Sequence, residues 1–473
     1  MSRPPRVAVV GGGITGLAAA FELARAGADV VLHEAANVLG GKVRTGPFAG
    51  AALDAGPDAF LARAPWAREL CDEVGLADDL VAPATRHAYL WAGGELRPFP
   101  HGLLLGVPTD LDALARSGLL STAGVDRVAE DLTRPDDAPP AGTDEAIGAL
   151  VRRRLGAEAL DRLVDPLLSG VFAGDVERLS AAAAAPQLAA AAASGPSLVR
   201  GARQALARAA ALSREAMPPG GEPGGPAPVF LTVRGGLGRL VARLHEAVGA
   251  ERTRLGSRVE GLRRTAGGYE LQAGGGVEAH DAVLVASPAP EASRLLAALD
   301  PGAAAVLAGI EYASVALVSF AYPLAAVPRP LDGSGFLVPR SAGLLMTACS
   351  WSSSKWAHVG GDGTARLRVS AGRDGDDRIA ALDDGALVSA LRADLRTTMG
   401  IDAEPAQVRV TPWPASLPQY RPGHLDRLAS LEASLAGAAP GVVATGAAFR
   451  GVGLPACIDQ GRQAARRLLG RLG

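Results

Sequence analysis

Apolar and polar positions follow two different periods at the start of the chain. Residues 6–10 form a short β-branched run, residues 14–26 repeat alanine and leucine at helical spacing, and residues 28–33 form a second β-branched run. Short apolar runs predict buried strands, whereas apolar residues three and four positions apart predict an amphipathic helix. The beginning of the chain therefore predicts a βαβ unit.

The rest of the chain predicts a mostly helical middle section and a mixed second half. Residues 108–212 are rich in alanine, leucine and arginine, which predicts a helical insert. Glycine and proline crowd residues 218–228, as is typical of a flexible connector, and residues 134–142 predict a polar loop. The further strands that we expect cover residues 229–233, 281–286, 312–321, 343–350, 365–370 and 407–410, with short hairpin strands between 258 and 284. The further helices that we expect cover residues 65–74, 238–248, 385–399 and 455–472.

The order of these elements favours an α/β nucleotide-binding domain with another domain inserted into it. The 473 residues exceed the ~250–300 at which a single core usually divides, so we expect two or three packed subdomains. The formal net charge is −2, and only Lys42 and Lys355 among the 47 basic residues are lysine. Because a nucleic-acid binder would carry a clustered basic excess, we expect no nucleic-acid partner.

The cysteines and one long uncharged run of residues help to predict the cellular compartment. Cys71, Cys349 and Cys457 lie far apart, with no CxxC motif and no histidine at metal spacing, which predicts neither a disulfide framework nor a structural metal site. Residues 179–199 are uncharged, but they are mostly alanine broken by prolines, so we expect no transmembrane segment. The apolar stretch near residue 10 is too short for a signal peptide. These features predict a cytoplasmic protein.

A glycine-rich turn of the form GxGxxG follows the first predicted strand and opens the first predicted helix. Its first glycine permits a tight turn, the second lets the backbone approach a pyrophosphate, and the third lets the helix pack on the strand. The positive end of the helix would face the phosphates, and the acidic residue that ends the second strand would bind a ribose diol and disfavour NADP. The alternative is a glycine-rich turn without a ligand. The candidate cofactor residues are Gly11, Gly12, Gly13, Ile14, Thr15, Gly16, Glu34 and Ala35.

A second glycine turn follows at residues 40–45, with the sequence GGKVRT. The acidic residue, the glycine pair and the cation together resemble the second flavin motif of the superfamily that contains amine oxidases, phytoene desaturases and protoporphyrinogen oxidases. This resemblance implies that the cofactor is FAD, and it assigns Gly41 and Lys42 to the cofactor site.

A third glycine-rich segment, at residues 446–455, leads into the last predicted helix. Backbone N–H groups and the helix dipole favour negative charge at such a helix start. The segment could therefore stabilise a reduced flavin, whose negative charge lies on the side of N1 and the C2 carbonyl. An ordinary capped helix is the alternative. The candidate cofactor residues are Gly451, Val452, Gly453 and Leu454.

Longer motifs narrow the resemblance to one branch of the superfamily. They read GPDAF at 56–60, LRPFP at 96–100, FLTVRGGL at 230–237, SWSSSKW at 350–356, WPASLPQYRPGH at 413–424 and GVGLPACIDQG at 451–461. With these motifs the chain resembles the bacterial-type coproporphyrinogen III and protoporphyrinogen oxidases of haem biosynthesis. The likeness runs from residue 6 to about residue 468 and is weak between about 108 and 227.

This resemblance implies a mixed α/β fold: a Rossmann-like FAD-binding domain with an inserted β-sheet substrate domain and a helical domain, as in amine oxidases and p-hydroxybenzoate hydroxylase. We expect the FAD-binding domain at residues 1–90, 228–300 and 430–473, the substrate-binding domain at 91–107 and 301–429, and the helical domain with its linker at 108–227. We also assign to the cofactor site Gly56, Pro57, Asp58, Ala59, Val259 and Trp413.

The resemblance also implies the reaction. Coproporphyrinogen III would be oxidised to coproporphyrin III in three two-electron steps, with hydride transfer to flavin N5 and reoxidation by O2 to give H2O2. No protein side chain is expected to be catalytic, because the redox chemistry belongs to the cofactor. The scattered histidines and the lack of a Ser/His/Asp cluster agree with this expectation. Protoporphyrinogen IX is the alternative substrate.

A substrate with several propionates requires cations at the rim of an apolar slot, because arginine pairs with carboxylates and unpaired buried carboxylates are costly. The candidates are Arg86, His87, Arg97 and Lys355. The resemblance to plant-type relatives would place an arginine at position 87, where this chain has histidine. For each candidate a solvated surface charge is the alternative.

Two other classes of protein remain as alternatives. An amine oxidase or carotenoid desaturase of the same superfamily would act on a different substrate, and a non-catalytic binding protein of the same fold would hold no flavin. For the porphyrinogen oxidase, peripheral membrane contact through the helical domain and hand-over of the product to a ferrochelatase are compatible with the sequence.

Overall fold

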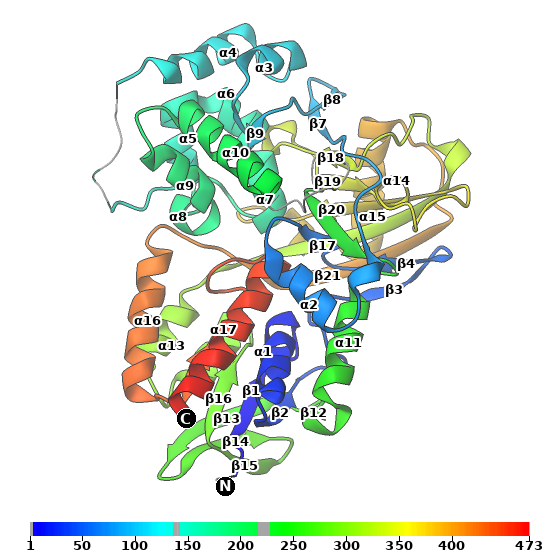
Figure 1. The fold of residues 1–473 in the computed structure, drawn as a ribbon. Coiled ribbons are helices and arrows are strands. Elements are labelled where there is room, and N and C mark those ends of the chain that lie inside the picture. Colours follow the sequence, from blue (N-terminus) through cyan, green and yellow to red (C-terminus); the bar gives the residue numbers. More distant parts are fainter. Residues whose placement is uncertain (1–2, 136–139, 141, 216–227, 473) are drawn as a thin grey trace. The chain divides into compact units, whose positions relative to one another are not determined.

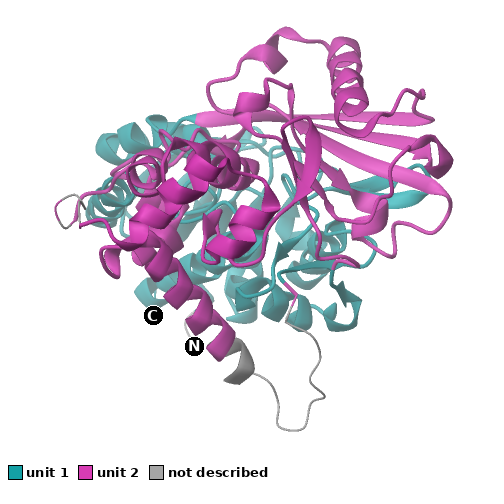
Figure 2. Cartoon of the chain, turned by 90° about the horizontal axis from the view of Figure 1, so that it is seen from above, with its two compact units in different colours: residues 1–82, 229–311, 424–473 teal, residues 83–228, 312–423 magenta. Residues whose placement is uncertain are grey.

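The computed structural model describes residues 3–135, 140, 142–215 and 228–472, and for residues 212–215 it describes the backbone alone. Most of the predicted connector at 218–228 and of the predicted polar loop at 134–142 lies outside the described residues. The chain forms two compact units (Figure 2). Unit 1 contains residues 1–82, 229–311 and 424–473, and unit 2 contains residues 83–228 and 312–423. The division into three domains stays a prediction.

Unit 1 is built on a five-stranded parallel sheet with the order β12-β2-β1-β16-β22 (Figure 1). Its strands are almost continuously buried because parallel sheets are covered on both faces, which explains the uninterrupted apolar runs in the sequence. The predicted βαβ unit at the start of the chain is confirmed, with Val10 beside His33 in the register of β1 and β2. The strands are β1 (Arg6–Val10), β2 (Asp29–His33), β12 (Thr253–Arg254), β16 (Ala282–Val285) and β22 (Val442–Ala444).

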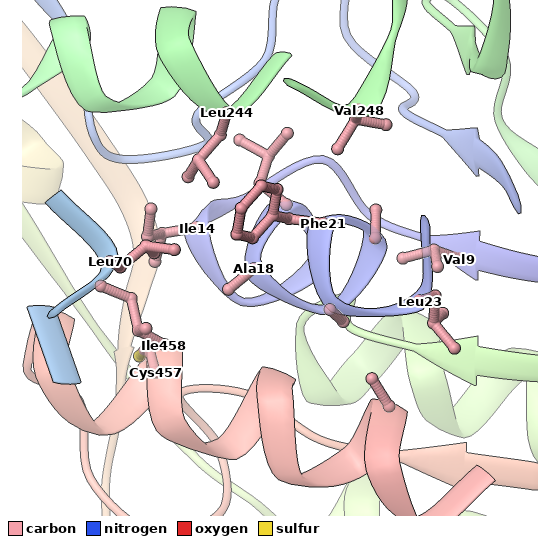
Figure 3. Packing of buried hydrophobic residues seen from close by; sticks show 14 of the residues in the cluster. Val9, Ile14, Ala18, Phe21, Leu23, Leu70, Leu244, Val248, Cys457 and Ile458 are labelled. Atoms are coloured by element: carbon pink, nitrogen blue, oxygen red, sulfur yellow. The ribbon is translucent and has the colours of Figure 1, made fainter. Parts of the chain in front are cut away.

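The core of unit 1 surrounds the first helix. Figure 3 shows Phe21 and Ala18 of α1 facing Leu244 of α11 on one side and Ile458 of α17 on the other. Gly461 permits the close approach of α17, because a Cβ there would lie 2.3 Å from the Thr15 carbonyl oxygen. The helices of unit 1 are α1 (Ile14–Arg25), α2 (Pro65–Glu73), α11 (Gly238–Val248), α12 (Ala289–Leu296), α13 (Pro301–Ala308), α16 (His424–Ala438) and α17 (Leu454–Leu472).

Three small antiparallel sheets complete unit 1. One is the hairpin β3-β4, one has the order β5-β11-β6, and one is the meander β13-β14-β15. Their strands are β3 (Thr45–Phe48), β4 (Ala51–Asp54), β5 (Phe60–Leu61), β6 (Leu80–Val81), β11 (Phe230–Val233), β13 (Val259–Thr265), β14 (Gly268–Ala273) and β15 (Gly276–His280).

Unit 2 is built on a seven-stranded mixed sheet with the order β21-β17-β20-β19-β18-β7-β8. Leu387, Leu391 and Leu395 of α15 recur every four residues and pack into the same core as Val318 and Phe320 of β17. The strands of unit 2 are β7 (Tyr89–Ala92), β8 (Glu95–Pro98), β9 (Leu103–Leu104), β10 (Val107–Pro108), β17 (Tyr312–Pro323), β18 (Gly335–Leu337), β19 (Met346–Trp351), β20 (Thr364–Ala371) and β21 (Gln407–Pro418).

Helices fill the segment of unit 2 that the sequence predicts to be helical. Asp110 and Ser121 cap the first two of them through their side-chain oxygens. Among the described residues no helix combines the length and the apolar character that crossing a membrane requires. The helices of unit 2 are α3 (Leu111–Ser117), α4 (Thr122–Ala129), α5 (Ile147–Leu155), α6 (Ala157–Ala159), α7 (Asp165–Phe172), α8 (Ala181–Ala184), α9 (Pro186–Ala193), α10 (Leu198–Glu215), α14 (Ser352–Lys355) and α15 (Asp384–Met399).

The predicted strand at 407–410 is too short. Strand β21 continues through Pro412 and Pro414 to Pro418, because it is an edge strand that pairs with β17 alone and its prolines need not donate to a second neighbour. Helices α12, α13 and α16 also have no counterpart in the sequence predictions.

Candidate cofactor and substrate sites

The first glycine turn joins β1 to α1 and leaves its backbone open. The amide of Gly11 donates to the His33 carbonyl at 2.8 Å, and its φ of +109° needs glycine. Gly13 begins α1 without a side-chain cap, the first turn of α1 has no acidic residue, and a Cβ on Gly13 would meet no atom within 4 Å. The positive end of α1 is therefore accessible to an anion, as the predicted role of residues 11–16 requires.

Glu34 follows β2 and braces this turn. One carboxylate oxygen accepts the Gly12 amide and the other accepts the Ala36 amide, both at 2.7 Å, with Ala35 between them. Each carboxylate oxygen can accept more than one hydrogen bond. Glu34 can therefore fix the turn and still accept a ribose hydroxyl, so its predicted role fits the geometry.

The second glycine turn lies against the first. Gly40 donates to the Gly12 carbonyl at 2.8 Å, and a Cβ on Gly41 would lie 3.3 Å from the Gly13 Cα. Lys42 is half-buried, and burial lowers the pKa of its ammonium group. Among the residues that the structure describes, Lys42 has no ion-pair partner. A half-buried cation beside an open helix N-terminus is suited to a phosphate group.

Thr45 and Asp54 connect the second turn to the start of α11. The Thr45 hydroxyl donates to the buried Asp54 carboxylate and accepts the Gly238 amide at 2.7 Å. The same carboxylate accepts the Leu237 amide at 3.1 Å. The GGKVRT motif and the end of the FLTVRGGL motif are therefore linked through hydrogen bonds to Thr45 and Asp54. The sequence analysis missed this link because the two motifs lie far apart in the chain.

The remaining predicted cofactor residues are spread over both units. Gly56, Pro57, Asp58 and Ala59 form the link between β4 and β5, and Val259 is the buried first residue of β13, all in unit 1. Trp413 lies on β21 in unit 2. The cofactor role of these residues stays a prediction.

The third glycine segment is held by side chains on two helices. Gln460 of α17 accepts the Arg450 amide at 2.9 Å and donates to the Gly451 carbonyl at 3.3 Å. His424 of α16 is hydrogen-bonded through Nε2 to the Phe449 carbonyl at 2.9 Å. Val452 and Gly453 follow, and Leu454 begins α17. Both GH and CIDQG stand out in the sequence, but their function as clamps of this loop appears only in the structure.

Cys457 connects the third segment to the second turn. It is buried, and its thiol lies 3.7 Å from the carbonyl oxygens of Gly451 and Val452. Burial raises the pKa of the thiol to about 11, although the charge of Lys42 opposes this shift. Cys457 is therefore a neutral thiol at pH 7, close enough to Lys42 for the two groups to interact electrostatically.

Three of the four predicted substrate cations belong to neighbouring segments of unit 2. The Ala84 amide donates to the Lys355 carbonyl at 2.8 Å, and Ser334 donates to the His87 carbonyl at 2.8 Å. Arg86 and His87 are exposed, whereas the Lys355 ammonium lies 5.0 Å from the centre of the Trp356 ring. The segments around residues 84–87 and 352–355 are therefore brought together.

Arg97 lies on β8 and has other interactions. Its guanidinium is paired with Glu95 and lies against the end of α3, where a Cβ on Gly118 would contact it. Its predicted role as a propionate ligand would require the loss of the Glu95 pair.

Two further cationic groups of unit 2 escaped the sequence analysis. The Arg329 guanidinium lies over the rings of Tyr89 and Trp351, at 5.3 and 5.2 Å from their centres. Burial raises the pKa of the Asp165 carboxyl group to about 6, and the positive charges of Arg340 and Arg373 partly oppose this rise. Among so many arginines these had no local signal, because aromatic stacking and burial arise only from tertiary packing.

Comparisons with known proteins give a consistent result. The family described as flavin containing amine oxidoreductase matches residues 14–469. The coproporphyrinogen III oxidase of Bacillus subtilis (strain 168) is 35% identical over 97% of this chain and 96% of its own length. The chloroplastic protoporphyrinogen oxidase 1 of Arabidopsis thaliana is 31% identical over 95% of this chain and 85% of its own length. A solved structure of a candidate protoporphyrinogen oxidase from Exiguobacterium sp. 255-15 has a TM-score of 0.85 and 32% identity over 100% of both chains.

Proposed function

The chain belongs to the flavin-containing amine oxidoreductase family, and from this premise we propose that it oxidises coproporphyrinogen III to coproporphyrin III. The protein is an FAD-dependent oxidoreductase. The substrate assignment is supported by relatives named coproporphyrinogen III oxidase that match nearly the whole chain, including those of Bacillus subtilis and Staphylococcus aureus.

The residues of unit 1 fit FAD. The feature that carries the placement of FAD is the open start of α1, where Gly13 is the N-cap, because a helix N-terminus without a side-chain cap is ready to bind a pyrophosphate. Lys42 would add a positive charge on the side of the second turn. Glu34 would hold the adenosine ribose while its other hydrogen bonds keep the turn in shape.

The redox chemistry comes from the cofactor, and the chain positions it. When bound, FAD accepts the hydride equivalents that the macrocycle loses and returns them to O2, with release of H2O2. Gln460 and His424 hold the loop at 446–453, so its backbone N–H groups and the positive end of α17 keep a fixed position. Fixed dipoles stabilise developing negative charge without reorganisation.

The propionates of the substrate would be bound in unit 2. Lys355, Arg86 and His87 belong to neighbouring segments there, and each can donate a charge-assisted hydrogen bond to a carboxylate when protonated. Coproporphyrinogen III carries four propionates and protoporphyrinogen IX carries two. Several neighbouring cations agree with a substrate that carries propionates, and the choice of four over two rests on the relatives named coproporphyrinogen III oxidase.

Protoporphyrinogen IX is the second candidate substrate. It is supported by the similarity to the chloroplastic protein of Arabidopsis thaliana and to the Exiguobacterium structure. We further propose that the protein is cytoplasmic. Peripheral membrane contact and hand-over of the product to a ferrochelatase are compatible with this function.

The test is a substrate panel. The FAD-loaded protein is incubated under air with coproporphyrinogen III, protoporphyrinogen IX and a set of primary amines, while porphyrin fluorescence and H2O2 are followed. We expect porphyrin and H2O2 from coproporphyrinogen III, well above the rate of autoxidation without enzyme. Oxidation of the amines alone would overturn the proposal, and a preference for protoporphyrinogen IX would establish the second candidate.

A further inference from the structure

Two histidines and a glutamate from distant parts of unit 1 meet where β2 ends. His33 is the last residue of β2, and Glu278 and His280 lie on β15. One side-chain nitrogen or oxygen from each residue lies within 4.8 Å of those of the other two. His280 Nε2 is 3.7 Å from a Glu278 oxygen, and the two imidazole rings are nearly perpendicular with centres 6.4 Å apart.

The histidine rings are buried with unused nitrogen atoms. His33 and His280 are 1% and 3% exposed. Among the described residues, His33 Nε2 and both ring nitrogens of His280 have no hydrogen-bond partner. Buried polar atoms without partners are rare and destabilising, so such a cluster requires an explanation. The buried ring of His424 in the same unit shows the usual solution, because its Nε2 is bonded to a backbone carbonyl.

The remaining nitrogen of His33 has an oxygen partner. His33 Nδ1 lies 3.0 Å from the Ser257 hydroxyl oxygen. Histidines that bind metals usually bond through one ring nitrogen to an oxygen atom, which fixes the tautomer and leaves the other nitrogen for the metal. When Nδ1–H donates to the Ser257 hydroxyl oxygen, the lone pair of His33 lies on Nε2, the nitrogen that has no partner among the described residues.

We propose that His33, Glu278 and His280 bind a Zn²⁺ ion. Two imidazoles and one carboxylate form a known ligand set for zinc, with a fourth position for water. The Glu278 side chain is 30% exposed, so the ion and its water would enter from that edge. This site departs from the sequence expectation of no metal ligands, because the two histidines are far apart in the chain and only the fold brings them together.

Arg6 is the group that competes with the ion. Its guanidinium lies 3.0 Å from a Glu278 oxygen and 3.8 Å from an Asp29 oxygen. The Glu278 oxygen that Arg6 contacts, Oε2, is the same one that lies 3.7 Å from His280 Nε2. Metal binding therefore requires Glu278 to present its other oxygen to the ion, or Arg6 to move toward Asp29. The carboxylates of Asp29 and Glu278 offset two of the three positive charges that the ion and Arg6 would carry together.

A bound ion would fasten β15 of the meander to the end of β2. Glu34, which braces the first glycine turn, directly follows His33. The ion binds the folded chain and would therefore raise its resistance to unfolding. The FAD content is expected to stay unchanged, because Glu34 keeps its own backbone hydrogen bonds.

The experiment uses the FAD-loaded protein after treatment with a chelator and dialysis. Zn²⁺ is titrated against a competing chelator dye, and bound zinc is counted by elemental analysis. We expect about one Zn²⁺ per chain, loss of this site in His33→Leu and in His280→Leu, and about tenfold weaker binding in Ser257→Ala. His245→Leu is the matched control and should keep the site, because His245 also has a buried Nε2 without a partner but lies outside the cluster.

A second measurement does not depend on the variants. X-ray absorption spectroscopy of the zinc-loaded wild-type protein should show two imidazoles and oxygen ligands at about 2.0–2.1 Å. Zinc content that is equal in the wild type and in His280→Leu would mean an adventitious ion only and would overturn the proposal. The proposal would equally fail if no saturable binding were observed, or if sulfur ligands appeared in the spectrum.

Discussion

Among single residues, Gly13 permits a test of cofactor binding that does not disturb folding. A side chain there would meet no protein atom within 4 Å, and its φ of −69° is open to any residue. The turn itself therefore does not need glycine at this position, and we propose that the glycine permits close approach of a pyrophosphate. By contrast, a side chain on Gly16 would collide with the Gly11 carbonyl, so that position is structural.

The substitution Gly13→Val should therefore leave the fold intact and remove FAD. We expect FAD binding to weaken by more than tenfold, or by more than about 1.4 kcal/mol, while the circular dichroism spectrum stays that of the wild type. Gly470→Val is the control, because it also adds a side chain into open space, at the far end of α17. A yellow, FAD-loaded Gly13→Val protein would show that the turn is assigned wrongly.

Lys355 permits a test of the substrate side at the same scale. Removal of a charge-assisted hydrogen bond costs about 1.5–3 kcal/mol, so Lys355→Ala should raise KM for coproporphyrinogen III about ten- to hundredfold. FAD content should not change, because the candidate FAD turns lie in unit 1 and Lys355 in unit 2. Lys355→Arg should recover most of the affinity, and an unchanged KM in Lys355→Ala would remove Lys355 from the substrate site.

At the scale of secondary-structure elements, the glycine motifs were predictable and their connections were not. The glycine run at Gly11, Gly12 and Gly13 predicts a turn, because few other residue types suit a backbone that a ligand would approach closely. Asp54 gives no such signal, yet its carboxylate joins the second glycine turn to α11. Its partners are adjacent only after folding, so a single sequence cannot reveal the link.

Helix α7 illustrates a buried charge that sequence alone cannot recognise. Its first residue, Asp165, is 5% exposed, and burial raises its pKa to about 6, with Arg340 and Arg373 opposing the shift. The folded state therefore holds the Asp165 proton more tightly than the unfolded state does. As the pH rises from about 4 to about 6, this carboxyl group lowers the free energy of unfolding by up to about 3 kcal/mol.

Asp165→Asn removes this dependence. Relative to the wild type, the variant should gain resistance to urea between pH 4 and pH 6 and keep that gain at pH 7, because its side chain never ionises. Asp126→Asn, an exposed change on α4, is the control and should show no such trend. A constant difference between wild type and Asp165→Asn across this range would contradict the assignment.

At the scale of the whole molecule, the mixed α/β fold and the membership of the flavin family followed from motifs spread along the chain. Those motifs occupy turns, where chemistry restricts the residue type most strongly. For the helical segment of unit 2, only the composition supported a prediction. The positions of Arg329 and Arg340 could not be recognised from the sequence, because the chain is rich in arginine throughout. The low net charge of −2 is compatible with a few placed cations that bind an anionic substrate.

We propose that coproporphyrinogen III is oxidised by the FAD of this protein. The most direct test mixes the FAD-loaded protein with coproporphyrinogen III in the absence of O2, so that autoxidation cannot contribute, and follows flavin absorbance and porphyrin fluorescence together. We predict that the flavin loses its colour in proportion to the porphyrinogen consumed, and that admission of O2 restores the colour and releases H2O2. A flavin that stays oxidised in the presence of excess coproporphyrinogen III would contradict the proposed oxidation of this substrate by FAD.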